Sequence, residues 1–508
     1  MTLRAPRSAL PLLAFLAAFA LPLLTLTRSL GSDEASSVWF SRLPPMTVLL
    51  RLCDPHPPAY YLLLSAWQVG GDAEFWLRFP SLLASVLSVA LLIRLTRAAA
   101  GARAAGWTGL LLATFPLQTW YAGEVRMYSL VQLLSLLMAA AGWRLLQRLR
   151  RGDGQPPGWR VWLPWLLSAL AALFTDYAAL PVWWLLQLAW LHAGSPQPRR
   201  WWAAQAGVGL PWLAWWIATP QAAALATSYH SVFIAVQAQR LGLALTPTLA
   251  GRLLTAALLA ALLLSLAAAF GLRRSASRSR SIAHEGGLRS RCSDFSRRTC
   301  RLTWLALLAL CLTPGLLTVK RQLVVLLPLI ALGMAAAWQP VAAPRRAWPA
   351  AWALLGLIVT LWAAGQHPHG EPWRETAAQV AAAGPPVVWV DELAAPAWAY
   401  YTRRAAADVP AWTPLRGRDL PALPSMQPAP GAALWIISAQ SRYRNLVALL
   451  PLAFGQDYEL QAAQVALGIG EYRYQRRLQP LTVPPETPPP PRAAQWGLLL
   501  PSPLATCD

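Results

Sequence analysis

Charged residues are scarce in this chain of 508 residues, where Asp, Glu, Lys and Arg together make up only 13%. Soluble globular proteins carry about a quarter of their residues as these four types. In contrast, 56% of the residues are hydrophobic. This balance excludes a soluble enzyme, a fibrous protein and a disordered chain, and it predicts a protein that crosses a membrane several times.

Lysine and cysteine are also rare. Of the 43 basic residues only Lys320 is a lysine, which is typical of codon bias in a GC-rich genome. The five cysteines are scattered, without metal-type spacing and without an evident disulfide framework. The sequence also lacks an internal repeat, a P-loop and a dinucleotide-binding fingerprint. It therefore carries none of the common sequence signatures of nucleotide, zinc or disulfide-rich proteins.

Apolar stretches dominate instead, and a bilayer span takes roughly 20 residues of this kind. We find eleven candidates: 8–26, 77–97, 105–121, 128–147, 159–175, 177–193, 201–219, 251–271, 302–319, 322–340 and 347–364. The first resembles a signal peptide, but it is as long as a span and no small-residue cleavage site precedes Gly31. The sequence therefore predicts a mainly α-helical, polytopic membrane bundle of about eleven transmembrane helices.

The basic residues predict the orientation of these spans. With Arg4 and Arg7 in the cytoplasm, 23 arginines fall in cytoplasmic segments, and nine basic residues fall in outer loops before residue 365. This asymmetry follows the positive-inside rule, and it explains the net charge of +22 without a nucleic-acid partner. The densest basic run, 273–301, is predicted to be a disordered cytoplasmic loop beside anionic lipid head groups.

Acidic residues show the opposite distribution. Those on the predicted outer side are Asp33, Glu34, Asp54, Asp72, Glu74, Glu124 and Asp176. Acidic residues contribute little to orientation, so this bias needs another cause. Charges close to a membrane are costly and are usually functional. We therefore expect an active site at the outer membrane face.

Three sections of the chain are expected. Residues 1–364 form the transmembrane module, in which the long first outer loop, 27–76, contains a short interfacial helix after Pro57-Pro58, and 220–250 is a second such element. Helix-like and strand-like segments alternate over 365–478, which predicts a small α/β domain on the outer side. Residues 479–508 form a proline-rich tail.

Within that outer domain the predicted elements follow one another closely. They are a helix over 373–383, a strand over 387–390, a helix over 395–404, a strand over 433–438, a helix over 442–453 and a strand over 458–474.

In the interfacial helix of the first outer loop, Tyr60, Leu63, Leu64 and Trp67 share one face, which favours contact with the membrane interface.

Three polar clusters could carry chemistry. The pair Asp33-Glu34 follows the first helix, although acids at a helix N-terminus are also ordinary solvated residues. The second cluster is Asp54, His56, Tyr60 and Tyr61, for which a capped helix with a tyrosine belt is the alternative interpretation.

The third cluster lies in the turn between two predicted spans and consists of Tyr121, Glu124, Arg126 and Tyr128. One interpretation is that Glu124 and Arg126 form an ion pair that closes the turn. The other is that the guanidinium of Arg126 is directed at an anion, because it pairs well with phosphate.

These motifs, in this order, resemble those of the GT-C glycosyltransferases that use polyprenyl-phosphate sugars. The similar branch is the family 39-like group, with protein O-mannosyltransferases and aminoarabinose transferases. The resemblance rests on the Asp33-Glu34 pair, the His56-Pro57-Pro58-Ala59-Tyr60-Tyr61 stretch and the Tyr121–Tyr128 turn. It covers roughly 1–150 well, and more loosely Lys320-Arg321-Gln322-Leu323, where Gln322 replaces the usual aromatic, and Glu371-Pro372-Trp373-Arg374.

The resemblance implies a sugar transfer from a lipid phosphate to a hydroxyl group at the outer face, with inversion at the anomeric carbon. It assigns the general base to Asp33 and the orientation of base or sugar to Glu34, although the two roles could be exchanged. Arg126, Lys320 and Arg321 are the candidate cations for the lipid phosphate. For Lys320 and Arg321, snorkelling at a helix end is the alternative.

The remaining candidate donor-binding residues are Asp54, His56, Tyr60, Tyr61, Tyr121, Glu124 and Tyr128. Asp54 and His56 could also hold a divalent metal ion, since some members of the family use one and others do not. His367 and His369 near Glu371 form a weaker metal motif, for which a linker is the alternative.

The expected function is therefore that of a membrane glycosyltransferase in the cytoplasmic membrane of a bacterium, with its N-terminus inside and its C-terminal domain outside. The expected partners are a polyprenyl-phosphate sugar, a hydroxyl acceptor on a glycolipid, glycan or protein, and membrane lipids. A transporter or lipid flippase is the alternative function, and a non-catalytic membrane scaffold is a third. The sequence does not identify the sugar, the acceptor or the oligomeric state.

Overall fold

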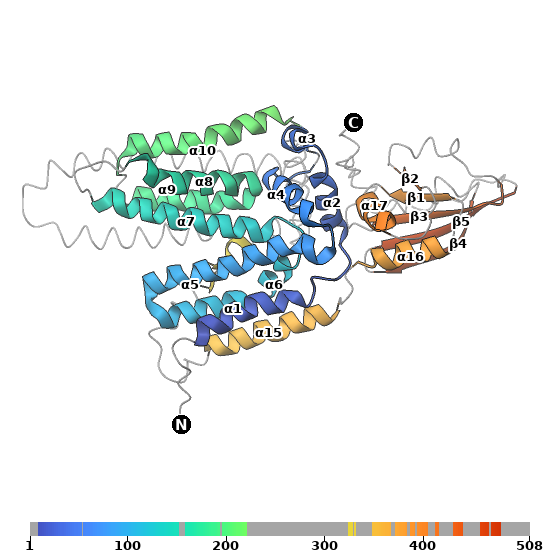
Figure 1. Ribbon diagram of the computed structural model, residues 1–508, viewed down its shortest axis with the longest axis horizontal. Helices are drawn as coiled ribbons and strands as arrows, with labels where there is room; N and C mark the ends of the chain where they lie inside the picture. The colour runs from blue at the N-terminus through green and yellow to red at the C-terminus, as the bar shows by residue number, and fades with distance from the viewer. Residues whose placement is uncertain are drawn as a thin grey trace, which may run out of the picture.

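The protein is mainly helical, with one small sheet. The computed structural model describes residues 9–52, 54–151, 158–193, 196–220, 324–328, 330–331, 348–366, 371–383, 387–391, 394–404, 412–415, 430–439, 458–466 and 469–478. Helices α1 to α10 and α15 lie together, and the sheet with α16 and α17 lies at one end of this group (Figure 1). The prediction of a mainly helical chain with a small sheet is confirmed.

Eight of the eleven predicted apolar stretches coincide with helices in the described part of the chain. These helices are α1 (Ala9–Leu23), α5 (Glu74–Ala113), α6 (Pro116–Ala122), α7 (Tyr128–Arg151), α8 (Trp159–Thr175), α9 (Leu180–His192), α10 (Pro198–Ala218) and α15 (Trp348–Gln366). Among the helices that the structure describes, only Glu74–Ala113 and Tyr128–Leu149 are long and apolar enough to cross a membrane. The count of about eleven spans is therefore not confirmed. The stretches 251–271 and 302–319 and most of 322–340 lie outside the described residues.

Helix α5 combines two of the predicted spans, 77–97 and 105–121, and reverses direction at Gly101. The backbone of Gly101 has φ 85°, a left-handed value that favours glycine. The two limbs then pack together, because a Cβ added at Gly109 would lie 2.5 Å from Cγ1 of Ile93. The second predicted span is itself interrupted after Ala113, where Pro116 begins the separate helix α6.

Several helices expose large apolar side chains on their outer faces. More than half exposed, for example, are Leu12, Leu16, Leu167, Leu210, Ile217, Leu354, Ile358 and Trp362, on α1, α8, α10 and α15. Exposed apolar surface of this extent is typical of a membrane or protein contact. It agrees with the membrane location that the composition predicts.

The segment 27–76, predicted to be the first outer loop, folds into short helices: α2 (Ser32–Ser41), α3 (Pro45–Leu50), α4 (Ala59–Trp67) and the 3-10 turn η1 (Gln68–Gly70). A further 3-10 turn, η2 (Tyr177–Ala179), precedes α9. The predicted membrane-facing side of α4 is wrong in part. Tyr60 and Leu64 are buried inside the protein, and of the apolar face only Leu63 is 41% exposed. The reason is that α4 packs between α2 and α8.

The C-terminal part contains α16 (Trp373–Ala383), α17 (Ala395–Arg404) and a five-stranded sheet in the order β2-β1-β3-β5-β4. Its strands are β1 (Val387–Asp391), β2 (Trp412–Leu415), β3 (Ala433–Ala439), β4 (Tyr458–Ala466) and β5 (Ile469–Arg476). Strand β1 pairs in parallel with β2 and β3, and β5 is antiparallel to β3 and β4.

Two corrections to the predicted elements follow from this sheet. The single strand predicted over 458–474 is the hairpin of β4 and β5, and strand β2 was not predicted. The predicted helix over 442–453, the loop from 221 to 250, the basic run 273–301 and the tail 479–508 lie outside the described residues. The domain boundaries at 364 and 478 stay predictions.

The sheet domain is attached to the first outer loop, where α17 packs against α2 (Figure 1). The backbone N–H of Leu30 donates to the hydroxyl of Tyr401 at 2.6 Å. Arg374 pairs with Glu74 at 2.7 Å, and the Tyr400 hydroxyl donates to the carbonyl of Asp72 at 2.6 Å. The C-terminal part is therefore fixed directly beside the start of α2.

Candidate functional site

The start of α2 holds the two predicted catalytic carboxylates, and they lie in different environments. Asp33 is exposed, whereas Glu34 is only 4% exposed. Consecutive residues of an α-helix point about 100° apart, so one can face outward while its neighbour enters the protein. The helix geometry thus separates two side chains that are indistinguishable in the sequence.

Glu34 is held by four hydrogen-bond donors. Arg78 donates from Nε to Oε1 at 2.8 Å and from Nη2 to Oε2 at 2.7 Å. The backbone N–H groups of Val125 and Gly31 donate to the same carboxylate at 2.9 and 2.8 Å. Burial alone would raise the pKa of Glu34, but the charge and hydrogen bonds of Arg78 hold it below the usual value. Glu34 is therefore an ionised anchor between α2, α5 and the turn at 125.

Arg78 itself is fully buried, and its remaining donors are satisfied. It donates to the carbonyls of Leu26, Arg28 and Ser29 at 2.9, 2.5 and 3.1 Å. A buried ion pair is stable only when its members have such additional hydrogen bonds. Arg78 was counted in the sequence only as one of the nine outer-side basic residues. The positive-inside rule disfavours a basic residue on the predicted outer side, and this was the one sequence signal that Arg78 has a specific role as the partner of Glu34.

Arg126 lies next to Asp33 and is 5% exposed. Its Nη1 donates to the backbone carbonyl of Asp33 at 3.2 Å and to Oγ of Ser37 at 3.1 Å. Its Nε is buried and has no hydrogen-bond partner within the described part of the chain. No described acidic side chain lies within 4.0 Å of this guanidinium. Arg126 is thus a buried cation with hydrogen-bonding capacity to spare.

The Glu124–Arg126 ion pair, the alternative interpretation of this turn, is not formed. Glu124 accepts a hydrogen bond from the indole N–H of Trp120 and lies 3.9 Å from the guanidinium of Arg28. Arg28 is itself buried and stacks over the Trp120 ring at 4.6 Å. The sequence did not single out Arg28 as part of the site.

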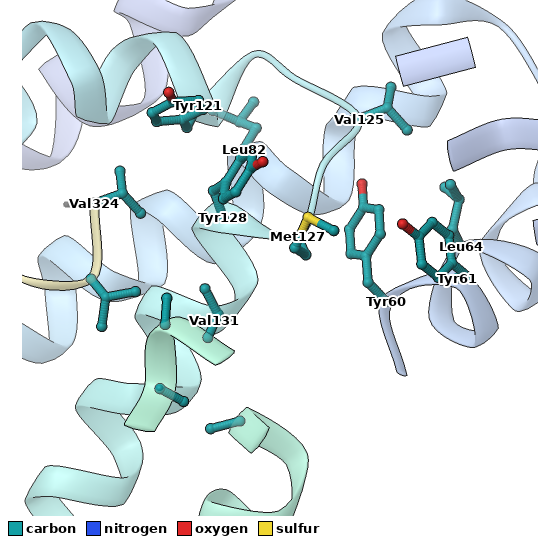
Figure 2. Close-up of a cluster of buried hydrophobic side chains, with 14 of the residues drawn as sticks. Tyr60, Tyr61, Leu64, Leu82, Tyr121, Val125, Met127, Tyr128, Val131 and Val324 are labelled. Atoms are coloured by element: carbon teal, nitrogen blue, oxygen red, sulfur yellow. The ribbon is translucent and has the colours of Figure 1, made fainter. Parts of the chain in front are cut away.

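Four tyrosines, Tyr60, Tyr61, Tyr121 and Tyr128, lie in the buried cluster that also contains Val125 and Met127, the two neighbours of Arg126 in the chain (Figure 2). Tyr60 and Tyr61 are fully buried with ring centroids 6.0 Å apart, and the Tyr121 and Tyr128 centroids are 4.9 Å apart. Burial raises the pKa of Tyr60 and of Tyr61 far above 10, so both are neutral. Their hydroxyls lie near Ser81 and Asp54 but make no hydrogen bond of acceptable geometry within the described residues.

Unpartnered buried hydroxyl groups are rare in folded proteins and call for an explanation, such as a bound ligand or water. The Tyr60 ring lies beside Met127, on the side of the turn that carries Val125 (Figure 2). Tyr61, Tyr128, Asp33 and Asp54 are the groups that act electrostatically on Arg126, and they raise its pKa against the effect of burial. The site therefore gathers the Arg126 cation, the carboxylates of Asp33 and Asp54, and neutral tyrosine hydroxyl groups.

His56 forms a second buried pair in this region. Its Nδ1 lies 2.9 Å from Oδ2 of Asp176, and both residues are buried. The backbone N–H of His56 donates to Oδ1 of Asp54 at 2.9 Å, and Asp176 also accepts from the N–H of Ala178 at 2.7 Å. Asp176 was noted in the sequence as an outer-side acid but not as a partner of His56, from which it is 120 residues distant.

The metal site predicted at Asp54 and His56 gains no support from this geometry. Within the part of the chain that the structure describes, no group of three or more His, Cys, Asp or Glu side chains could hold a metal ion. His56 is engaged by Asp176, and Asp54 by the backbone of His56. Lys320, Arg321, His367 and His369 lie outside the described residues.

No protein-family model and no curated protein matches this chain. Among solved structures, the chain is similar to ArnT from Cupriavidus metallidurans in the apo state, with 13% identity, a TM-score of 0.46, and coverage of 92% of this chain and 97% of that one. It is also similar to the oligosaccharyltransferase AglB from Archaeoglobus fulgidus in complex with an inhibitory peptide and a dolichol-phosphate. There the identity is 12%, the TM-score 0.49, and coverage 92% and 74%.

A structure of the same ArnT bound to undecaprenyl phosphate is similar with 14% identity and a TM-score of 0.41. At these values the likeness concerns the general fold. It carries nothing about individual site residues, which have to be argued from the geometry given above.

Proposed function

We propose that this protein is a membrane glycosyltransferase that moves a sugar from a polyprenyl-phosphate donor to a hydroxyl acceptor at the outer face of the cytoplasmic membrane. The supporting observation is the contact between Arg126 and the backbone of Asp33. It combines an exposed carboxylate with a buried cation that has no described carboxylate partner. Such a pair suits a reaction that takes up a proton and releases an anion.

In the proposed reaction Asp33 is the general base. The acceptor oxygen bonds to the anomeric carbon on the face opposite the phosphate, and the bond between this carbon and the phosphate oxygen breaks with its electron pair. The acceptor proton passes to the carboxylate of Asp33, and the configuration inverts. The engagement of Glu34 by four donors favours Asp33 over Glu34 as the base, because the acceptor sites of Glu34 are already used.

Arg126 stabilises the departing lipid phosphate in this proposal. Negative charge grows on the phosphate oxygens in the transition state, and a fixed cation in a site with little water stabilises it most. The buried Nε of Arg126 and the hydroxyls of Tyr60 and Tyr61 are donors without hydrogen-bond partners, and they are the candidates to bind the phosphate oxygens. Lys320 and Arg321 remain candidates from the sequence alone.

The decisive experiment uses the purified protein in phospholipid vesicles, supplied with polyprenyl-phosphate mannose or with a polyprenyl-phosphate arabinose-type sugar. Bacterial envelope glycolipid serves as acceptor. We expect the sugar to appear on the acceptor together with free polyprenyl phosphate. Movement of the intact lipid-linked sugar across the bilayer, without cleavage, would instead establish the flippase alternative. Neither cleavage nor movement would leave the scaffold interpretation.

A further inference from the structure

The carboxylate of Glu371 lies at the junction between the C-terminal sheet domain and the start of α2. Its Oε2 accepts hydrogen bonds from the backbone N–H of Ser32 at 2.8 Å and from Oγ of Ser32 at 2.6 Å. The indole N–H of Trp373 donates to the same oxygen at 2.7 Å. Its other oxygen lies against Gly31, where an added Cβ would be 3.5 Å away.

Helix α2 depends on this outside acceptor. The first N–H groups of a helix have no partner within the helix, and residue Gly31, which precedes α2, has no side chain to supply one. Glu34 accepts the N–H of Gly31, and Glu371 accepts the N–H of Ser32 from 339 residues further along the chain. The backbone immediately before Asp33 is therefore fixed by a residue of the C-terminal part.

The backbone on the other side of Asp33 is fixed as well, because its carbonyl accepts from Arg126. Asp33 thus lies between two contacts, one from the turn that contains Arg126 and one from Glu371. The indole of Trp373, which is itself fully buried at the first turn of α16, prevents rotation of the Glu371 carboxylate. The arrangement is a rigid support around a single exposed carboxylate.

We propose that Glu371 is a positioning residue through which the C-terminal domain orients Asp33, so that the domain is a working part of the active site. This inference rests on the proposed function, in which Asp33 is the base. Its chemical reason is that a base must lie within hydrogen-bond reach of the acceptor proton, and a displacement of about 1 Å can reduce turnover by about a hundredfold. Burial also raises the pKa of Glu371, and a neutral amide in its place would retain the acceptor oxygen.

The test compares Glu371→Ala, Glu371→Gln and Ser32→Ala in the vesicle assay. We expect Glu371→Ala to lower kcat by about tenfold to a hundredfold while the KM for the lipid donor changes little. Glu371→Gln should restore kcat to near the wild-type value, because its amide oxygen can still accept from Ser32. Ser32→Ala, which removes one of the donors and keeps the fold, should lower kcat by a few-fold.

Arg374→Ala is the matched control. It removes other contacts between the C-terminal part and the segment 27–76, the pair with Glu74 and the hydrogen bond to the carbonyl of Thr27, without touching Ser32. We expect it to leave kcat unchanged. Unchanged kcat in Glu371→Ala, or an equal loss in Arg374→Ala, overturns the inference. If Asp33→Asn is fully active, the assignment of Asp33 as the base fails, and the inference about Glu371 fails with it, whereas the absence of sugar transfer by the wild-type protein is what would contradict the proposed function. If Asp33→Asn is inactive and Glu371→Ala is active, only the positioning role fails.

Discussion

Buried polar side chains in two regions of the described structure are satisfied in different ways. In the tryptophan-rich helix group, formed by α8, α9 and α10, the Trp201 indole donates to Gln187 at 2.8 Å and Gln187 donates to Gln205 at 2.7 Å. In the polar cluster around α2, the buried groups are instead the ion pair of Glu34 with Arg78 and the pair of His56 with Asp176.

The difference indicates which region carries the chemistry. Neutral amides and indoles satisfy one another at modest cost, and stacked rings such as Trp190 and Trp201, with centroids 5.3 Å apart, fill the space around them. Buried charges cost several kcal/mol each unless they are paired and hydrogen-bonded. Buried charges beside the unpartnered Nε of Arg126 therefore indicate a functional site. The buried polar groups of the tryptophan-rich helix group are explained by packing alone.

The largest effect should separate Asp33 from Glu34. Asp33→Asn removes the proposed base, so we expect kcat to fall by about a hundredfold to ten-thousandfold. The melting temperature should not change, since the side chain is exposed. Glu34→Gln should show the opposite pattern: its melting temperature should fall, and its kcat should change less than that of Asp33→Asn. Turnover in vesicles and melting of the purified protein measure the two quantities. Equal activity of Asp33→Asn and wild type would remove Asp33 from its role.

Arg78→Met should give the largest loss of stability. It leaves the carboxylate of Glu34 buried with two backbone N–H donors but without its ion-pair partner, which costs about 3–5 kcal/mol. The folded-state pKa of Glu34 is lowered, so the ion pair stabilises the protein above about pH 4, and this stabilisation is lost as the pH falls through the folded-state pKa. Denaturation of both proteins across pH measures this. A constant difference down to acid pH would contradict the ion-pair explanation. The double variant Glu34→Gln, Arg78→Met should be less destabilised than the sum of the two.

Arg126→Gln should reduce donor use without unfolding the protein. The lost cation no longer stabilises the departing phosphate, and we expect kcat/KM for the lipid donor to fall by about a hundredfold to a thousandfold. Binding of polyprenyl phosphate alone, followed by intrinsic tryptophan fluorescence, should weaken in parallel. If the variant melts far below the wild type and binds the lipid normally when folded, Arg126 is structural.

Gln187→Leu should have the smallest effect and should be limited to stability. It leaves the Trp201 indole and the Gln205 carbonyl without their partner, which costs about 1–3 kcal/mol. Sugar transfer by the folded fraction should be unchanged. The double variant Gln187→Leu, Gln205→Leu is the control, and it should recover part of the loss. A large drop in transfer would mean that the helix group also contributes to the site.

Much of the helical part could be predicted because its signal is local. Apolar runs such as 159–175 coincide with a helix residue for residue, since the hydrophobicity of a segment does not depend on its neighbours. Strand β2 was missed because it has four residues and contains Pro414, which is unusual inside a sheet. The reversal at Gly101 was predicted only as a gap between two spans, as the glycine alone does not specify the packing of Ile93 on Gly109.

For the candidate site, the sequence shows the types and the order of the residues, but it does not show which side chains interact with one another. The sequence by itself determined that Asp33 and Glu34 are adjacent and that an arginine follows at position 126, and it predicted that acids gather on one side of the helices. Only the tertiary structure decided that Glu34 forms an ion pair with Arg78, that His56 pairs with Asp176, and that Glu371 accepts a hydrogen bond from Ser32. The physical reason is distance along the chain. Composition and helical period act over a few residues, whereas these contacts join groups 44, 120 and 339 positions apart, and packing alone brings them together.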